Sequence, residues 1–167
     1  VQGAAGGVGS ACVQIARHFG ATVTGLCRRE NIDMVKALGA HHAIESTREN
    51  IEALSHRYDI IIDTSGSMSY RQAEPLLNYC GRLLLVSADL PQTLAMYMTP
   101  KRDGKKGLIG YAGELVADMK ILMQLVSDDD YQPWIDRRYS LRELPQAHAD
   151  YDRDGKRGNW VINVISP

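Results

Sequence analysis

The chain has 167 residues, of which 44% are hydrophobic and 23% are charged, as in an ordinary single-domain globular protein. No apolar run approaches the roughly 20 residues needed to cross a bilayer, and the formal net charge of −1 gives no general attraction to nucleic acid or to an anionic membrane. We therefore expect a soluble domain that has neither nucleic acid nor membrane among its partners.

The three cysteines, Cys12, Cys27 and Cys80, match neither a zinc knuckle nor a CxxC redox pair. They are expected to be buried small side chains in a reducing compartment. Because no secretory signal stands at the start of the chain, we expect a cytoplasmic location. Val1 and Gln2 leave no room for an element ahead of the glycine cluster that follows, so we also expect that preceding residues have been removed.

The first hundred residues alternate between helix and strand patterns. Apolar residues at steps of three and four predict a helix from the glycine cluster to Phe19, and Gly20 ends it. Strands are predicted at 21–27, 43–44, 58–63 and 82–87, and helices at 32–38 and 49–55. The runs at 58–63 and 82–87 are typical of strands buried on both faces. This alternation predicts an α/β fold, a Rossmann-type doubly wound parallel sheet, in one domain spanning 1–167.

The remainder of the chain is less regular. Residues 89–106 contain two prolines and a basic run, which predicts an exposed excursion; a solvated loop is favoured over a nucleic-acid patch because aromatic stacking partners are missing. A strand is predicted at 108–111 and a helix at 115–126, where Met119 and Met123 are interpreted as core residues. The pattern then predicts a helix over 141–151, with Ser140 as its cap, and a closing strand over 160–165.

The stretch from Ala4 to Gly9 has the layout of the dinucleotide fingerprint GxGxxG, with Ala4 in place of the first glycine. In that layout Gly6 lets a pyrophosphate approach the backbone, and Gly9 lets the helix pack against the strand. The amides at the start of the helix would then hold the phosphates. Glycine clusters also form simple turns, but the helix that follows directly favours nucleotide binding.

The end of the second strand determines which dinucleotide is preferred. No carboxylate occupies this strand end, and Arg28 and Arg29 follow Cys27. Guanidinium groups bind phosphate through paired hydrogen bonds, so NADP(H) is favoured over NAD(H). In the alternative, one arginine caps a solvated helix start beside Glu30 and the other stays free to bind.

Small polar residues follow two of the predicted strands, namely Thr64, Ser65 and Gly66 after the strand at 58–63, and Ser87 and Ala88 after the next. Ligands in open parallel sheets bind beyond the carboxyl ends of the strands. These residues could therefore wall a nicotinamide ring and its ribose, although they would also be ordinary turn residues.

Several segments, in this order, resemble the cofactor domain of the medium-chain dehydrogenase/reductase superfamily, nearest its quinone-oxidoreductase-like branch, which is often grouped with the zinc-type alcohol dehydrogenases. They are GAAGGVG, VQIARHFGATV, CRREN, VKALGAHHAI, YDIIIDTSG, CGRLLLVS, PWIDRRYSLRELPQAH and DGKRGNWVINV. The resemblance implies an NADP(H)-dependent oxidoreductase that transfers hydride to a quinone, enone or carbonyl. It also implies a homodimer joined through the edge strand near Leu108 to Tyr111.

The resemblance assigns cofactor contacts residue by residue. It places the following residues at the pyrophosphate: Ala5, Gly6, Gly7, Val8 and Gly9. Arg28, Arg29 and Asn31 would face the 2′-phosphate. Thr64, Ser65, Gly66, Ser87 and Ala88 would lie near the nicotinamide and its ribose. Ser46 stands where relatives often place a tyrosine near the 2′-phosphate, and Lys156 is a further candidate.

The superfamily has an N-terminal catalytic domain, and the resemblance implies that this chain lacks it. The chain would then be a fragment with a truncated first strand, without catalytic residues or a metal site, that binds cofactor but turns over little substrate. Residues 141–165 would pack toward the missing domain. The alternative is a non-catalytic nucleotide-binding or interaction module of the same fold. The pair His41 and His42 lacks further ligands for a metal.

Overall fold

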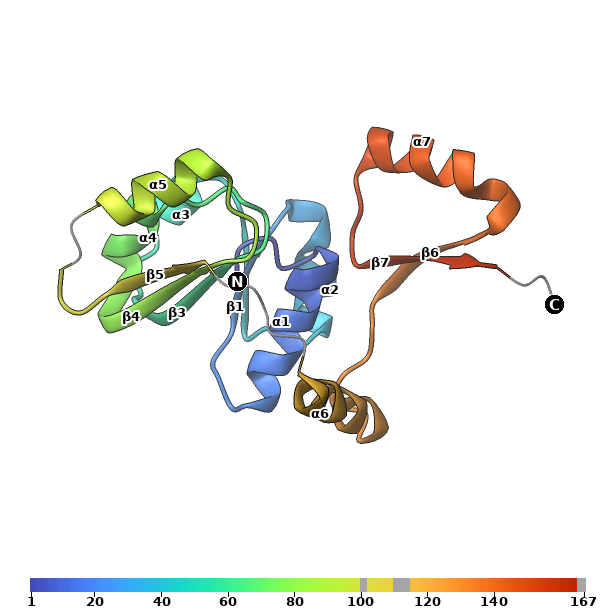
Figure 1. Cartoon of the computed structure of the whole chain (residues 1–167), viewed down its shortest axis with the longest axis horizontal. Helices are drawn as coiled ribbons and strands as arrows, with labels where there is room; N and C mark the ends of the chain where they lie inside the picture. The colour runs from blue at the N-terminus through green and yellow to red at the C-terminus, as the bar shows by residue number, and fades with distance from the viewer. Residues whose placement is uncertain (100–101, 110–114, 165–167) are drawn as a thin grey trace.

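A computed structural model describes residues 1–99, 102–109 and 115–164 (Figure 1). Its main sheet is parallel and contains β1 (Thr24–Cys27), β2 (His42–Glu45), β3 (Tyr58–Asp63), β4 (Leu77–Leu85) and β5 (Lys106–Ile109). The helices are α1 (Gly7–His18), α2 (Ile32–Ala37), α3 (Arg48–Glu52), α4 (Tyr70–Ala73), α5 (Leu90–Met98), α6 (Val116–Ser127) and α7 (Leu144–Asp154), with 3-10 turns at Arg29–Asn31, Glu74–Leu76 and Leu141–Glu143.

Gln2 joins the two parts of this sheet. It forms parallel bridges to Leu26 of β1 and to Asp63 of β3, so the first residues of the chain lie between these strands. The order across the sheet is therefore β2, β1, Gln2, β3, β4 and β5. This is the order of a doubly wound sheet, in which the chain reverses direction on either side of the first strand, and the fold predicted from the sequence is confirmed.

Two apolar clusters fill the space between the sheet and its helices. The first joins α1 and α2 to β1, with Val13 and Val35 fully buried. The second lies around β3 and β4, where Leu77 and Leu83 are fully buried and Met96 of α5 packs against them. These clusters fix the carboxyl ends of β1 and β3, where the candidate site lies.

The carboxyl-terminal part adds a separate parallel pair, β6 (Ile135–Ser140) and β7 (Asn159–Asn163), connected by α7 (Figure 1). The cap at Ser140 is confirmed, because its side chain and that of Glu143 form a capping box. The pair is tied to the start of the chain by the hydrogen bond from the Gly158 N–H to the Ala5 carbonyl, 2.7 Å long. The strand β6 has no counterpart among the predicted elements.

Several expectations from the sequence are wrong. Residues 90–98 form α5 instead of a loop, because Asp89 caps the helix and Pro91 lies in its first turn, where proline is tolerated. Lys105, expected on a solvated loop, is buried beside Glu74. Met119 and Met123 are 59% and 67% exposed, so they are not core residues.

Two further residues are more exposed than expected. Ile60 is 58% exposed, so β3 is not buried on both faces along its whole length. Cys80 is exposed within β4, where its backbone has the left-handed φ of 58°. Within the described residues, no helix has the length and apolar character of a membrane span. Two predictions fall partly outside the described residues: Gly110 and Tyr111 of the strand predicted at 108–111, and the last residue of the strand predicted at 160–165.

Candidate functional site

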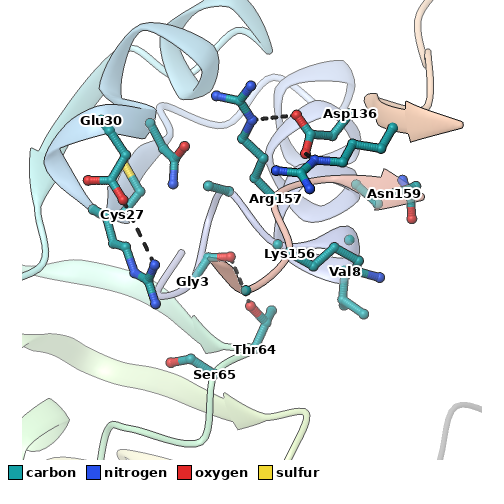
Figure 2. A pocket seen from close by; sticks show the side chains of 18 residues that line it. Gly3, Val8, Cys27, Glu30, Thr64, Ser65, Asp136, Lys156, Arg157 and Asn159 are labelled. Carbon is teal, nitrogen blue, oxygen red and sulfur yellow. Dashed lines mark hydrogen bonds and ion pairs between the residues drawn. The ribbon is translucent and has the colours of Figure 1, made fainter. Parts of the chain in front are cut away.

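A cleft of about 850 Å³ opens at the carboxyl ends of β1 and β3, on either side of the first residues of the chain (Figure 2). This is the point where a doubly wound sheet changes direction and where ligands of this fold bind. The cleft is lined by the glycine loop, by residues after β1 and β3, and by the segments next to β6 and β7: Gly3, Ala5, Gly6, Gly7, Val8, Ala11, Cys27, Arg28, Glu30, Asn31, Thr64, Ser65, Asp136, Arg137, Gly155, Lys156, Arg157 and Asn159.

The amino end of α1 faces this cleft. Gly6 is its N-cap and makes no side-chain capping bond, so the first amides of the helix have no side-chain acceptor. The chain approaches the helix closely, because a Cβ on Gly9 would stand 2.0 Å from the Gly3 carbonyl oxygen. The backbone N–H groups at a helix start without a side-chain cap can bind an anion.

Gly7 forms the wall opposite β7. A Cβ at this position would stand 3.0 Å from Asn159 Oδ1 and 3.5 Å from Lys156 Nζ. Figure 2 shows Lys156 beside Val8 at this end of α1. Among the described residues Lys156 has no acidic partner, so its ammonium group is available to an anion in the cleft. The absence of a side chain on Gly7 keeps this space open.

The segment after β1 forms the second charged region. Arg28 Nη1 lies 3.9 Å from Glu30 Oε1, and both side chains are largely exposed. The guanidinium group also reaches across the cleft, since a Cβ on Gly155 would stand 3.9 Å from Arg28 Nη2. Burial raises the pKa of the Cys27 thiol, and the Glu30 carboxylate raises it further.

Asn31 contributes a buried polar atom to the same region. The residue is 8% exposed, and its Oδ1 has no hydrogen-bond partner among the described residues. An unsatisfied buried carbonyl oxygen costs about 1 to 3 kcal/mol. A ligand hydroxyl at this end of the cleft would satisfy it, so the residue fits a ribose-bearing ligand.

The loop after β3 is held by Asp63, whose side chain is completely buried. Asp63 Oδ1 accepts hydrogen bonds from the N–H groups of Ser65 and Gly66, at 2.9 and 3.1 Å, and from Ser65 Oγ at 2.8 Å. Its Oδ2 accepts from the Met68 N–H at 2.8 Å. This carboxylate therefore fixes the position of Thr64 and Ser65 at the cleft.

The rim next to β6 is built from paired charges. Asp136 binds Arg157 through Oδ1 and the Trp160 indole N–H through Oδ2, the latter at 3.1 Å. Arg137 lies 3.4 Å from Asp150 Oδ2 and stacks over the Trp160 ring. These contacts neutralise the two arginines and hold the rim in place; Figure 2 shows the pair of Asp136 and Arg157.

The cleft brings together most of the residues proposed from the sequence: Ala5, Gly6, Gly7, Val8, Arg28, Asn31, Thr64, Ser65 and Lys156. Six others lie outside its lining: Gly9, Arg29, Ser46, Gly66, Ser87 and Ala88. Gly9 packs against the first turn, as described above. Gly66 lies against the Ser87 carbonyl, which a Cβ would meet at 3.0 Å, and Ala88 packs against the second apolar cluster.

Arg29 and Ser46 have partners elsewhere. Arg29 Nε donates to Glu45 Oε2 at 3.1 Å, on the exposed surface beside β2. Ser46 exchanges hydrogen bonds with the side chain of Gln2, at 2.8 and 3.1 Å. Of the two neighbouring arginines, therefore, Arg28 alone lines the cleft.

The sequence did not reveal the rim of the cleft or the acidic residue beside Arg28. The β6–β7 pair brings four residues to the cleft: Asp136, Arg137, Arg157 and Asn159. No local sequence pattern predicted β6. The sequence predicts Glu30 only as the neighbour of a capping arginine, whereas the structure places it in the lining of the cleft. The position of Lys156 in the loop before the last strand was the one signal for this side of the cleft.

The cleft has the chemistry of a site for a dinucleotide: an uncapped helix start, two cations without strong partners, and small residues beside two strand ends. No group of three potential metal-ligating side chains is found among residues 1–99, 102–109 and 115–164.

The sequence and the fold match known proteins. The family model described as zinc-binding dehydrogenase matches residues 7–128. Over 99% of its length the chain is 26% identical to the mitochondrial NAD(P)H oxidoreductase RTN4IP1 of Bos taurus, of which it covers 47%. Over 64% of its length it is 36% identical to the chloroplastic NADPH-dependent alkenal/one oxidoreductase of Arabidopsis thaliana, of which it covers 28%.

Among solved structures, the quinone oxidoreductase from Coxiella burnetii is similar with a TM-score of 0.84 and 26% identity. The match covers 98% of this chain and 51% of that structure. The chain thus spans about half the length, or less, of the relatives that it matches.

Proposed function

Because the chain belongs to the zinc-binding dehydrogenase family, as a cofactor-binding domain of the quinone-oxidoreductase-like kind, we propose that its cleft binds NADP(H). The pyrophosphate would lie at the start of α1, between Gly7 and Lys156, where helix amides and an ammonium group meet. The 2′-phosphate would lie at Arg28, and Asn31 Oδ1 would accept a hydrogen bond from the adenosine ribose.

The observation that carries this proposal is that the cleft holds two cationic side chains on separate segments of the chain. Lys156 lies beside Gly7 at the start of α1, whereas Arg28 follows β1, so the two cations of one cleft come from different segments. A dinucleotide with a 2′-phosphate carries negative charge at two separate points. NADH lacks the second of these charges. The arrangement therefore supports NADP(H) over NAD(H), with the Arg28 guanidinium as the discriminating group.

The cofactor would supply the hydride for reduction of a quinone, enone or carbonyl. The role of this chain is to bind the dinucleotide and to orient its nicotinamide beside Thr64 and Ser65, which Asp63 holds in place. Relatives are named for quinone and alkenal/one substrates. We propose that substrate contacts come from residues outside this chain, and that the 167 residues alone bind cofactor with little turnover.

We further propose a homodimer through β5. Among the described residues this strand is the last in its sheet, and Leu108 and Ile109 are 44% and 37% exposed. An exposed edge strand offers its unpaired main-chain groups to a second strand. Residues 141–165 are proposed to contact the catalytic part of a full-length enzyme.

A cytoplasmic location stays a prediction, since the named relatives are mitochondrial or chloroplastic.

The test is a titration of the 167-residue chain with NADPH and with NADH, followed by the fluorescence of the nicotinamide. Saturable binding with clear preference for NADPH is expected. Equal affinities would contradict the assignment of Arg28, and binding of neither cofactor would contradict the proposed function. A non-catalytic module of the same fold would bind equally well; a full-length protein that binds NADPH and reduces no quinone, enone or aldehyde would favour it.

A further inference from the structure

A buried amide connects the loops that follow β2 and β3. Gln2 is 7% exposed, and its side-chain nitrogen donates to Ser46 Oγ at 2.8 Å and to Ser67 Oγ at 2.9 Å. The Ser46 hydroxyl donates in return to Gln2 Oε1 at 3.1 Å. Both polar atoms of this amide therefore have partners, and these partners hold the side chain in one orientation.

A chain of hydroxyl groups continues from Ser67 to the cleft. Ser67 Oγ lies 2.8 Å from Ser65 Oγ, and Ser65 Oγ lies 2.8 Å from Asp63 Oδ1. A carboxylate oxygen only accepts hydrogen bonds, so Ser65 gives its single proton to Asp63. Ser67 must therefore donate to Ser65. The bonds run in one direction, from Gln2 through the two serines to the carboxylate.

This direction decides what Ser65 can offer to a ligand. A hydroxyl has one proton and two lone pairs, and in Ser65 the proton and one lone pair are already used. One acceptor lone pair remains. It is a strengthened acceptor, because the hydrogen bonds of such a chain polarise one another. Ser65 therefore suits a ligand group that donates a hydrogen bond.

Thr64 has the same hydrogen-bonding polarity. Its Oγ1 lies 2.9 Å from the carbonyl oxygen of Gln2 and 3.3 Å from that of Gly3. Both carbonyl oxygens only accept, so the proton of Thr64 is used within the protein. Figure 2 shows Thr64 bonded to Gly3, with Ser65 next to it at the cleft. The two neighbouring hydroxyls thus have only lone pairs left for a ligand.

We propose that Gln2 is a positioning residue for the nicotinamide half of the cofactor. Through Ser67 it holds Ser65 Oγ as an acceptor for a hydrogen-bond donor of that half, which carries ribose hydroxyls and a carboxamide. The inference rests on the proposed binding of NADP(H), and it gives a role to a residue that does not itself line the cleft. Arg28 takes no part in this chain of bonds, so recognition of the 2′-phosphate should not depend on Gln2.

The test compares NADPH with adenosine 2′,5′-bisphosphate, which carries the 2′-phosphate and lacks the nicotinamide half. Isothermal titration calorimetry measures both ligands on the parent chain, on Gln2→Leu and on Ser67→Ala. Each variant should bind NADPH about threefold to tenfold more weakly, a loss typical of one hydrogen bond, and should bind the bisphosphate as the parent chain does. Ser67→Thr keeps the hydroxyl and should bind NADPH like the parent chain. Ser67 is exposed, so its variants test the inference even if Gln2→Leu fails to fold.

Ser69→Ala is the matched control on the same loop. The Ser69 hydroxyl forms the capping box of α4 with Gln72, so its loss should lower the stability of the chain and leave both affinities unchanged. The inference is wrong if a folded Gln2→Leu or Ser67→Ala chain binds NADPH like the parent chain, if both ligands weaken alike, or if Ser67→Thr loses as much affinity as Ser67→Ala. Binding of neither ligand to the parent chain would overturn the proposed function, and this inference with it.

Discussion

The ammonium group of Lys156 lies over Gly7 at the start of α1, where a Cβ on the glycine would stand 3.5 Å from Nζ. Two segments almost 150 residues apart in sequence thus enclose one space for an anion. The helix start supplies amides, and the loop before β7 supplies the charge.

Lys156→Ala should weaken binding of NADPH and NADH by the same factor, because both cofactors carry the pyrophosphate. The lysine is exposed, so solvent screens its charge and the loss should be roughly threefold to tenfold. Lys120→Ala, at an exposed lysine on α6, is the matched control. A loss confined to NADPH would place Lys156 at the 2′-phosphate instead.

Glu30→Gln should raise the affinity for NADPH. The Glu30 carboxylate lies 3.9 Å from the Arg28 guanidinium and shares its cleft, so it competes with a phosphate for that guanidinium and repels the phosphate directly. The gain should be roughly twofold to tenfold for these exposed charges, and NADH should bind as before. Glu52→Gln, on α3, is the control, and a weaker affinity for NADPH in the Glu30 variant would contradict this account.

Asp63→Ala should lower the free energy of unfolding by about 3 kcal/mol, because it leaves the buried Met68 N–H and the part-buried N–H groups of Ser65 and Gly66 without an acceptor. Asp63→Asn keeps one acceptor oxygen and should cost less. Urea denaturation measures both variants. Equal stability of the alanine variant and the parent chain would show that the carboxylate does not anchor this loop.

The stability of the 167-residue chain should rise between pH 6 and pH 8. Burial lowers the pKa of the Val1 amino group from 8.0 to about 6, and Cys12 and Asp63 partly oppose this shift. The unfolded chain therefore binds more protons than the folded chain in this window, and folding is favoured as the pH rises. Acetylation of Val1 removes the titrating group, so the rise should become smaller in the acetylated chain. Identical pH profiles would contradict the burial of this amino group.

Local patterns in the sequence were sufficient to predict much of the fold. The strand at 58–63 has the predicted boundaries, and α1 begins within the glycine string. Both depend on nearby residues, since an apolar run and a helical stripe are visible without knowledge of the rest of the chain.

Features that depend on contacts between residues distant in sequence could not be predicted from local patterns. Arg28 and Arg29 are equivalent in sequence, and Glu45 on the neighbouring strand draws Arg29 away from the cleft. Asp63 was visible as a strand end, but its four hydrogen bonds form only when the following loop folds back over it. The helical stripe of Met119 and Met123 predicted burial, although that face of α6 is exposed among the described residues.

We propose above all that the Arg28 guanidinium binds the 2′-phosphate of NADP(H). A double comparison of cofactor and variant tests this most directly. Dissociation constants for NADPH and NADH are measured on the parent chain, on Arg28→Ala and on Arg29→Ala. We expect Arg28→Ala to weaken NADPH by roughly tenfold, a typical loss for a charge-assisted hydrogen bond, while NADH and both affinities of Arg29→Ala stay unchanged. If Arg28→Ala weakens both cofactors alike, or if Arg29→Ala alone weakens NADPH, the account is contradicted.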